Sequence, residues 1–284
     1  MIKKYIFPLI LIISIIECTS EKITIKKTGI GYSTKDETVI TYKDIRKWYD
    51  KKDFEKIYDT LINVEDKNFF LDYLLIESAY NINRIKDIEP IYLKEKENKK
   101  TFFKGIVSFL NREYDKTIIY LKNLGKKEPV PAYFVGSAYL YTKDYPMAIG
   151  YLMLSVEWDM PWVYFTIANF YLIKNDIKKA YEYIKKAEDA CYDFEENILL
   201  DIKIKNIEIL VSEEKYEDAA TLALNIYKKY PEKVILYIDP GQIYFLQGNP
   251  EKAMNFWKEA LNNNEIRNSI KELIKEKISL LEKK

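Results

Sequence analysis

One arrangement of small and aromatic residues recurs along this chain and limits its fold more than any other feature. A small residue is followed by tyrosine three positions later, by alanine nine positions after that, and by another small residue seven positions further on. Three copies keep this spacing: Gly136, Tyr139, Ala148, Ser155; Ala168, Tyr171, Ala180, Ala187; and Gly241, Tyr244, Ala253, Ala260. A weaker copy consists of Ile207, Leu210, Ala219 and Ile226. Small residues at this spacing let two helices approach closely, so we expect stacked helical hairpins.

The composition supports helices and excludes several kinds of chemistry. Only 8 Gly and 9 Pro among 284 residues, with 31% charged residues, favour helices over turn-rich β structure. Histidine is absent and the cysteines are Cys18 and Cys191, so zinc sites, thiol proteases and histidine-dependent serine hydrolases are excluded. The 45 basic and 44 acidic residues give no basic field for nucleic acid.

The carboxylates and glycines indicate no catalytic or cofactor site. Most Asp and Glu residues lie among lysines at i, i+4 spacing, which is typical of a solvated helix face. The glycines never form a phosphate-binding loop. We therefore expect no enzyme activity, no cofactor and no metal, and we interpret Cys191 as a small core residue.

The N-terminus has the pattern of an export signal over residues 1–17. Lys3 and Lys4 precede an uncharged run of 12 residues, shorter than the about 20 residues that span a membrane. The following Ile15-Ile16-Glu17-Cys18 resembles a bacterial lipoprotein processing box, with Glu17 where that family prefers Gly, Ala or Ser. The resemblance implies lipidation of Cys18. Cleavage after Ser20, which would release a soluble protein, and an uncleaved anchor are the alternatives.

The remaining chain divides into four segments. Residues 18–40 are predicted to be the anchor cysteine and a flexible tether, with a short strand at residues 23–25. Degenerate hairpins are expected over 41–128, regular hairpins over 129–262, and a capping helix over 263–284.

Each hairpin is marked by a polar turn, followed by an apolar residue that opens its second helix. These openings occupy residues 52–57, 84–88, 113–117, 144–148, 175–180, 214–219 and 248–253. We also expect Asp239-Pro240-Gly241 to break or restart a helix, because proline lacks the N–H that a helix interior needs.

These hairpins resemble the tetratricopeptide-repeat family. Its first helix carries a glycine and then a tyrosine three residues later, as at Gly241 and Tyr244. Its second helix opens with alanine and an aromatic residue four positions on, as at Ala253 and Trp257. The family's pitch of 34 residues separates Ala219 from Ala253. The resemblance implies an all-α superhelical solenoid of about seven hairpins with a C-terminal capping helix.

In this family, residues of the first helices line a concave face that binds partner segments. Carried over to the matching repeats, that face comprises Tyr133, Ser137, Tyr141, Trp162, Phe165, Asn169, Ile204, Glu208, Ile238, Gln242 and Phe245. Trp162 is the strongest candidate, because it follows Pro161 at a helix start. Asn169 and Gln242 come next, because amides can bind a peptide backbone. Packing inside and between hairpins is the alternative role for the aromatic residues.

Taken together, these features predict a non-catalytic protein–protein interaction scaffold of a bacterial cell envelope. It would be anchored to a membrane by lipidated Cys18, on the periplasmic side or at the cell surface, and would bind a protein or peptide but no nucleic acid. A glycan-binding or glycan-processing protein on the same scaffold is the alternative function, and self-assembly into a homo-oligomer is a third.

Overall fold

The computed structural model describes residues 22–26, 37–64 and 66–282 of the chain. The predicted signal segment and Cys18 lie outside these residues. The described part is all-α except for one antiparallel pair of short strands. None of its helices has both the length and the apolar character needed to cross a membrane. Two compact units make up the chain: the first comprises Met1–Asp159 with Tyr192–Glu195, and the second comprises Met160–Cys191 with Glu196–Lys284.

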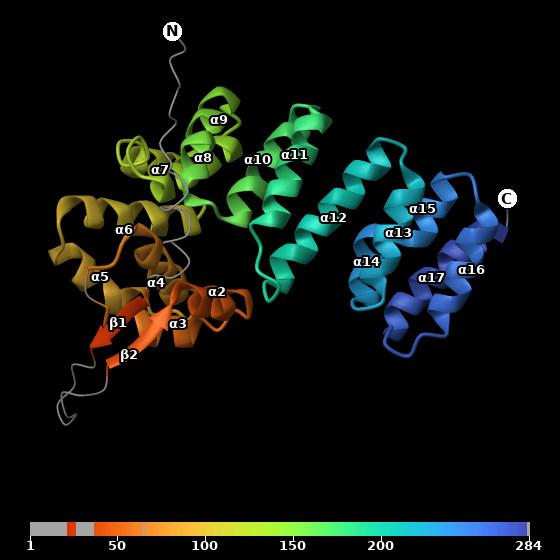
Figure 1. The fold of residues 1–284 in the computed structure, drawn as a ribbon, viewed down its shortest axis with the longest axis horizontal. Coiled ribbons are helices and arrows are strands. Elements are labelled where there is room, and N and C mark those ends of the chain that lie inside the picture. Colours follow the sequence, from red (N-terminus) through yellow and green to blue (C-terminus); the bar gives the residue numbers. More distant parts are fainter. Residues whose placement is uncertain (1–21, 27–36, 65, 283–284) are drawn as a thin grey trace, which may run out of the picture. The chain divides into compact units, whose positions relative to one another are not determined.

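The first unit contains the strand pair and the earlier helices (Figure 1). Strand β1 (Lys22–Lys26) pairs with β2 (Glu37–Thr41), with Ile23 opposite Ile40. The predicted strand at residues 23–25 is thereby confirmed, whereas β2 was not foreseen. The helices are α2 (Tyr42–Asp50), α3 (Phe54–Leu61), α4 (Phe69–Asn81), α5 (Ile85–Lys94), α6 (Glu97–Leu110), α7 (Tyr114–Leu121), α8 (Pro129–Tyr141), α9 (Tyr145–Leu154) and the 3-10 turn η1 (Ser155–Trp158).

The second unit begins with two long hairpins, continues through two short helices and ends in two longer ones (Figure 1). A helix break at Asp239 separates α14 from α15, which confirms the break expected at Asp239-Pro240-Gly241. The helices are α10 (Pro161–Ile173), α11 (Ile177–Asp189), α12 (Glu196–Ser212), α13 (Tyr216–Tyr227), α14 (Pro231–Ile238), α15 (Pro240–Leu246), α16 (Pro250–Leu261) and α17 (Asn268–Glu282).

A repeated turn joins the two helices of each hairpin. Within the described residues, the turn residue two positions before each second helix has a positive φ; these residues are Lys52, Asn83, Arg112, Lys143, Asn175, Glu214 and Gly248. The next N–H donates to the carbonyl five residues back, as from Asp176 to Tyr171 at 2.9 Å, which is the Schellman arrangement. The Asp176 carboxylate then caps α11 by accepting from the Lys179 N–H at 3.1 Å. One short turn therefore ends a helix and starts the next, and all the predicted second-helix openings are confirmed.

Small residues of the repeat lie where paired helices meet. Ala168 and Ala180 of the α10–α11 hairpin are fully buried. A Cβ added to Gly136 would lie 2.8 Å from the backbone nitrogen of Leu152, so α8 and α9 are too close for a larger residue. The uncharged helices α8 and α10 are mostly buried, whereas α11 carries exposed lysines on its outer side. The predicted fold class, an all-α tetratricopeptide-like solenoid, is confirmed by this architecture and by the structural similarities described below.

Candidate functional site

The second unit contains a groove with a volume of about 270 Å³. Helices α12, α14, α15 and α17 provide its walls. The residues that line it are Ile207, Glu208, Val211, Ile235, Leu236, Tyr237, Ile238, Asp239, Gln242, Ile243, Leu246 and Lys277. Most of these side chains are apolar, so the groove suits a ligand with apolar side chains of its own.

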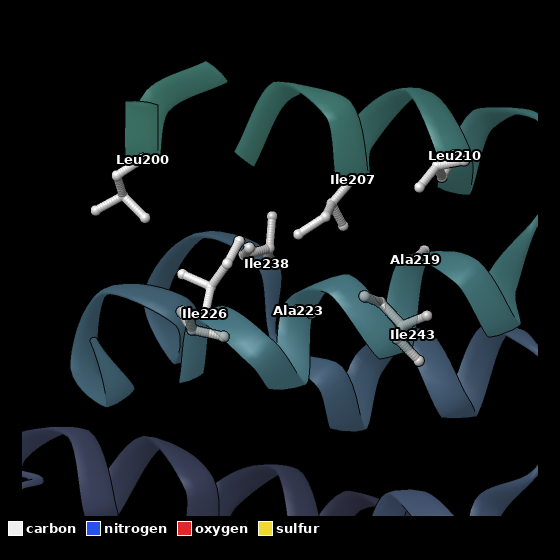
Figure 2. Packing of buried hydrophobic residues seen from close by; sticks show 10 residues of the cluster. Leu200, Ile207, Leu210, Ala219, Ala223, Ile226, Ile238 and Ile243 are labelled. Carbon is white, nitrogen blue, oxygen red and sulfur yellow. The ribbon is translucent and has the colours of Figure 1, made fainter. Parts of the chain in front are cut away.

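The groove has a rigid floor and an exposed apolar rim. Ile207, Ile238 and Ile243 are buried members of the core between α12, α13 and α15, and Figure 2 shows Ile207 on α12 pointing toward Ile238. On the rim, Leu236 and Leu246 are each 49% exposed and Tyr237 is 67% exposed. Large apolar side chains that are this exposed and this close together are typical of an interaction surface.

A buried polar cluster forms one end of the groove, centred on Asp239. The Asp239 carboxylate accepts hydrogen bonds from the Gly241 N–H at 2.8 Å, the Trp257 indole N–H at 2.9 Å and the Lys277 ammonium at 2.6 Å. Asp239 is almost fully buried, so its charge needs the Lys277 ammonium nearby. Because Asp239 is bonded to α15, α16 and α17, the cluster fixes the helix break that opens the groove.

The break also depends on Gly241. A Cβ at this position would lie 2.2 Å from the Trp257 indole nitrogen. Only glycine leaves room for the Trp257 ring against α15, and that ring is in turn held by Asp239.

Three residues that the sequence assigned to the concave face line this one groove: Glu208, Ile238 and Gln242. Gln242 is exposed and presents its amide at the groove, whereas Ile238 belongs to the buried floor. Sequence reasoning missed Leu236, Tyr237, Leu246 and Lys277. A signal was present, because residues 234–238 form an unbroken apolar run on a short helix, and such a helix cannot bury every side of that run.

The remaining candidates on the second unit lie on α10 and α15. Trp162, Phe165 and Asn169 share one side of α10, and each is partly buried. Phe245 packs against the core formed by α16 and α17 instead of lining the groove. Ile204 packs against the core between α12 and α13. For these residues, contact with a partner stays a prediction.

The candidates on the first unit contact other aromatic residues of α8 and its neighbours. Tyr133 packs against Trp158, with ring centroids 5.8 Å apart. Tyr141 is 62% exposed and stacks on Tyr114, with centroids 4.5 Å apart and the planes nearly parallel. Ser137 is buried on the same helix.

The described residues offer no group of three or more Asp, Glu or Cys side chains that could hold a metal ion. Cys191 is partly buried, and its thiol donates to the Ala187 carbonyl at 3.3 Å. Its predicted role in packing fits this position.

Comparisons with known proteins identify one matching repeat model and several solved structures with a similar fold. A family model described as tetratricopeptide repeat matches residues 163–193, which covers the α10–α11 hairpin. The crystal structure of MamA protein aligns over 58% of this chain and 90% of its own, with a TM-score of 0.50 and 15% identity. The Cut9–Hcn1 hetero-tetramer of the APC/C contains a chain that aligns over 82% of this one and 48% of its own, with a TM-score of 0.55 and 13% identity. No curated protein sequence matches this chain.

The matched repeat and these structures show that the chain contains a tetratricopeptide repeat at α10–α11 and shares the fold of tetratricopeptide-repeat proteins. Such folds generally serve as scaffolds for protein–protein interaction and are typically non-catalytic.

Proposed function

We propose that this protein is a non-catalytic scaffold of a bacterial cell envelope, and that it binds a segment of a partner protein in the α12–α14–α15–α17 groove. The observation that carries the proposal is the combination of a preformed apolar floor with the exposed Leu236, Tyr237 and Leu246 on its rim. Rigid apolar anchors bind peptide side chains at low entropic cost.

The polar groups of the groove favour a peptide. The exposed Gln242 amide can donate to and accept from a peptide backbone, and the exposed Glu208 adds an acceptor. The Asp239–Lys277 pair is neutral as a whole and Glu208 is paired with Lys205, so the groove selects for apolar side chains instead of one sign of charge. The Cut9–Hcn1 assembly supports a partner protein, because there a similarly folded chain occurs together with a second protein.

The envelope location rests on the N-terminal sequence. The short apolar run and the following Cys18 support export and lipid anchoring. Metabolic labelling with a fatty-acid analogue tests this part separately: the wild type should be labelled and Cys18→Ser should not. An unlabelled but secreted wild type would contradict lipidation and favour the soluble alternative.

Site-specific photo-crosslinking tests the groove. A benzophenone amino acid is placed at Gln242, and the full-length protein is irradiated in native membranes. The matched control carries the same group at Glu113, an exposed residue of the first unit. A protein adduct at position 242 that is absent at position 113, and that Leu246→Ser weakens, is the expected result.

Three outcomes would contradict the groove proposal. These are equal adducts at both positions, adducts only to glycan, and adducts only to a second copy of the chain. A parallel Trp162→Ala variant tests the α10 face: loss of the adduct there would extend the binding surface to α10.

A further inference from the structure

One buried carboxyl group of the first unit has no cationic partner among the residues that the structure describes. Glu77 lies on α4, and its carboxyl lies beside the Tyr73 and Tyr49 hydroxyls, which are hydrogen-bonded to each other at 2.9 Å. Its second oxygen, Oε2, is buried and has no hydrogen-bond partner among the described residues. Isolated buried charges are costly, so proteins usually pair them.

Other buried carboxylates of this protein follow that rule. Asp72, five residues earlier on α4, binds the Lys99 ammonium and accepts from the Tyr92 hydroxyl at 2.8 Å. Glu195 accepts two hydrogen bonds from Arg46, at 2.7 and 2.6 Å. Glu77 takes part in no comparable ion pair within the described residues, so its environment differs from theirs in the missing cation.

Aromatic rings from other elements pack on Tyr73, which lies one turn before Glu77 on α4. Tyr73 and Trp158 have centroids 6.3 Å apart at 84°, and Tyr133 lies 5.8 Å from Trp158. We call Tyr49, Tyr73, Glu77, Tyr133 and Trp158 the Glu77 cluster. Tyr49, Tyr133 and Glu77 are only partly buried, so the cluster reaches the surface although Oε2 does not.

A second buried polar atom lies on the same face of α8 as Tyr133. The Ser137 hydroxyl, one turn along α8, also has no hydrogen-bond partner in the described part of the chain. Two such atoms on neighbouring helices need an explanation, because buried polar groups are nearly always satisfied by the protein, by water or by a ligand.

We propose that the Glu77 cluster binds an alkylammonium group, from a lysine side chain or from a small amine. The ammonium would donate to Glu77 Oε2, and the aromatic faces would add cation–π attraction. A guanidinium fits less well, because it prefers both oxygens of a carboxylate and the Tyr49 and Tyr73 hydroxyls lie beside this one. A metal ion fits less well, because the described residues provide no group of three acidic ligands here.

Ionisation of the carboxyl is consistent with this role. Burial raises the pKa of Glu77, which shifts this carboxyl toward its neutral form. An ammonium bound at Oε2 would favour the carboxylate and recover part of the cost of burying it. This site is separate from the groove of the second unit, so it can fail without affecting the proposed function.

The test is a titration of the full-length protein with n-butylammonium chloride, followed through the Trp158 indole N–H signal in NMR spectra. That signal is assigned with Trp158→Phe, and n-butanol is the uncharged control. Saturable shifts with the amine but not the alcohol are expected. Glu77→Gln should weaken binding by about tenfold or more, because it removes the charge and keeps the shape. Glu113→Gln, which changes an exposed glutamate, should bind like the wild type.

Equal responses to the amine and the alcohol, or unchanged binding in a folded Glu77→Gln, would overturn the proposal. The absence of any response in the wild type would also overturn the proposal. It would indicate that ordered water hydrogen-bonds to Glu77 Oε2 and the Ser137 hydroxyl. A capped Gly-Lys-Gly peptide distinguishes the two sources: comparable binding indicates a lysine side chain, and binding of the free amine alone indicates a small amine.

Discussion

Each unit buries a carboxyl group among aromatic side chains, but the two carboxyls are compensated differently. Asp239 of the second unit has the Lys277 ammonium, the Trp257 indole and a backbone N–H around it. Within the described part of the chain, Glu77 of the first unit has only the Tyr49 and Tyr73 hydroxyls beside it, and its Oε2 has no hydrogen-bond partner.

The difference follows from what each carboxyl does in the fold. Asp239 lies at a helix break, so its backbone geometry depends on the bonds that its side chain makes to α16 and α17. Glu77 lies inside the continuous helix α4, which needs no side-chain bond to keep its shape. A structural carboxyl must therefore be fully satisfied, whereas Glu77 can keep an oxygen available for a ligand.

The largest expected effect is that of Asp239→Ala. It removes the acceptor for the Trp257 N–H and the Lys277 ammonium, so both lose their partner at once. We expect a loss of about 2–4 kcal/mol in the free energy of unfolding, measured by urea denaturation. Glu259→Ala, an exposed position on α16, should change it by less than about 0.5 kcal/mol. Similar values for the two variants would mean that the break does not depend on Asp239.

The helical array and its turns could be predicted from the sequence, because their causes are local. Small residues at fixed spacing and polar turns followed by an apolar residue specify each hairpin, and every opening was found in this way. Asp239-Pro240 also predicted the helix break, because proline lacks the backbone N–H that a helix interior needs.

The groove and the Glu77 cluster were only partly predictable, because their causes are not local. The first-helix pattern predicted Gln242 as a groove residue. It did not predict Lys277, which contacts Asp239 across 38 residues of sequence. Tyr49 meets Tyr73 across 24 residues, and neither spacing follows from a helical period. That no described cation reaches Glu77 is likewise a property of the assembled helices.

Lys277→Met should have a smaller effect and would make Asp239 resemble Glu77. Methionine keeps much of the apolar stem but removes the charge, so Asp239 retains only the Trp257 and Gly241 donors. The Lys277 side chain is 25% exposed, so water screens part of the ion pair. We expect a loss of about 1–2 kcal/mol in urea denaturation, less than for Asp239→Ala. A loss as large as that of Asp239→Ala would show that the ion pair, and not the indole bond, fixes the break.

The smallest expected effect is that of Glu77→Gln on stability, and it is visible mainly as a change in pH dependence. Tyr49 and Tyr73 are the titratable groups beside this carboxyl, and Tyr133 acts on Tyr49. Burial raises the pKa of Glu77 above its ordinary value of 4.5. Between the ordinary and the raised pKa, the folded protein binds more protons than the unfolded chain. The free energy of unfolding should therefore fall as the pH rises through this range.

Glutamine cannot ionise, so Glu77→Gln should lose this contribution. Relative to the wild type, the variant should become more stable as the pH rises above 4.5, as measured by urea denaturation at a series of pH values. Glu113→Gln serves as the control for a general charge effect. A constant difference between wild type and Glu77→Gln across the series would mean that Glu77 is not held in its neutral form. Adding n-butylammonium should reduce the pH-dependent difference in stability. The bound cation would stabilise the Glu77 carboxylate, as the Lys277 ammonium stabilises the Asp239 carboxylate.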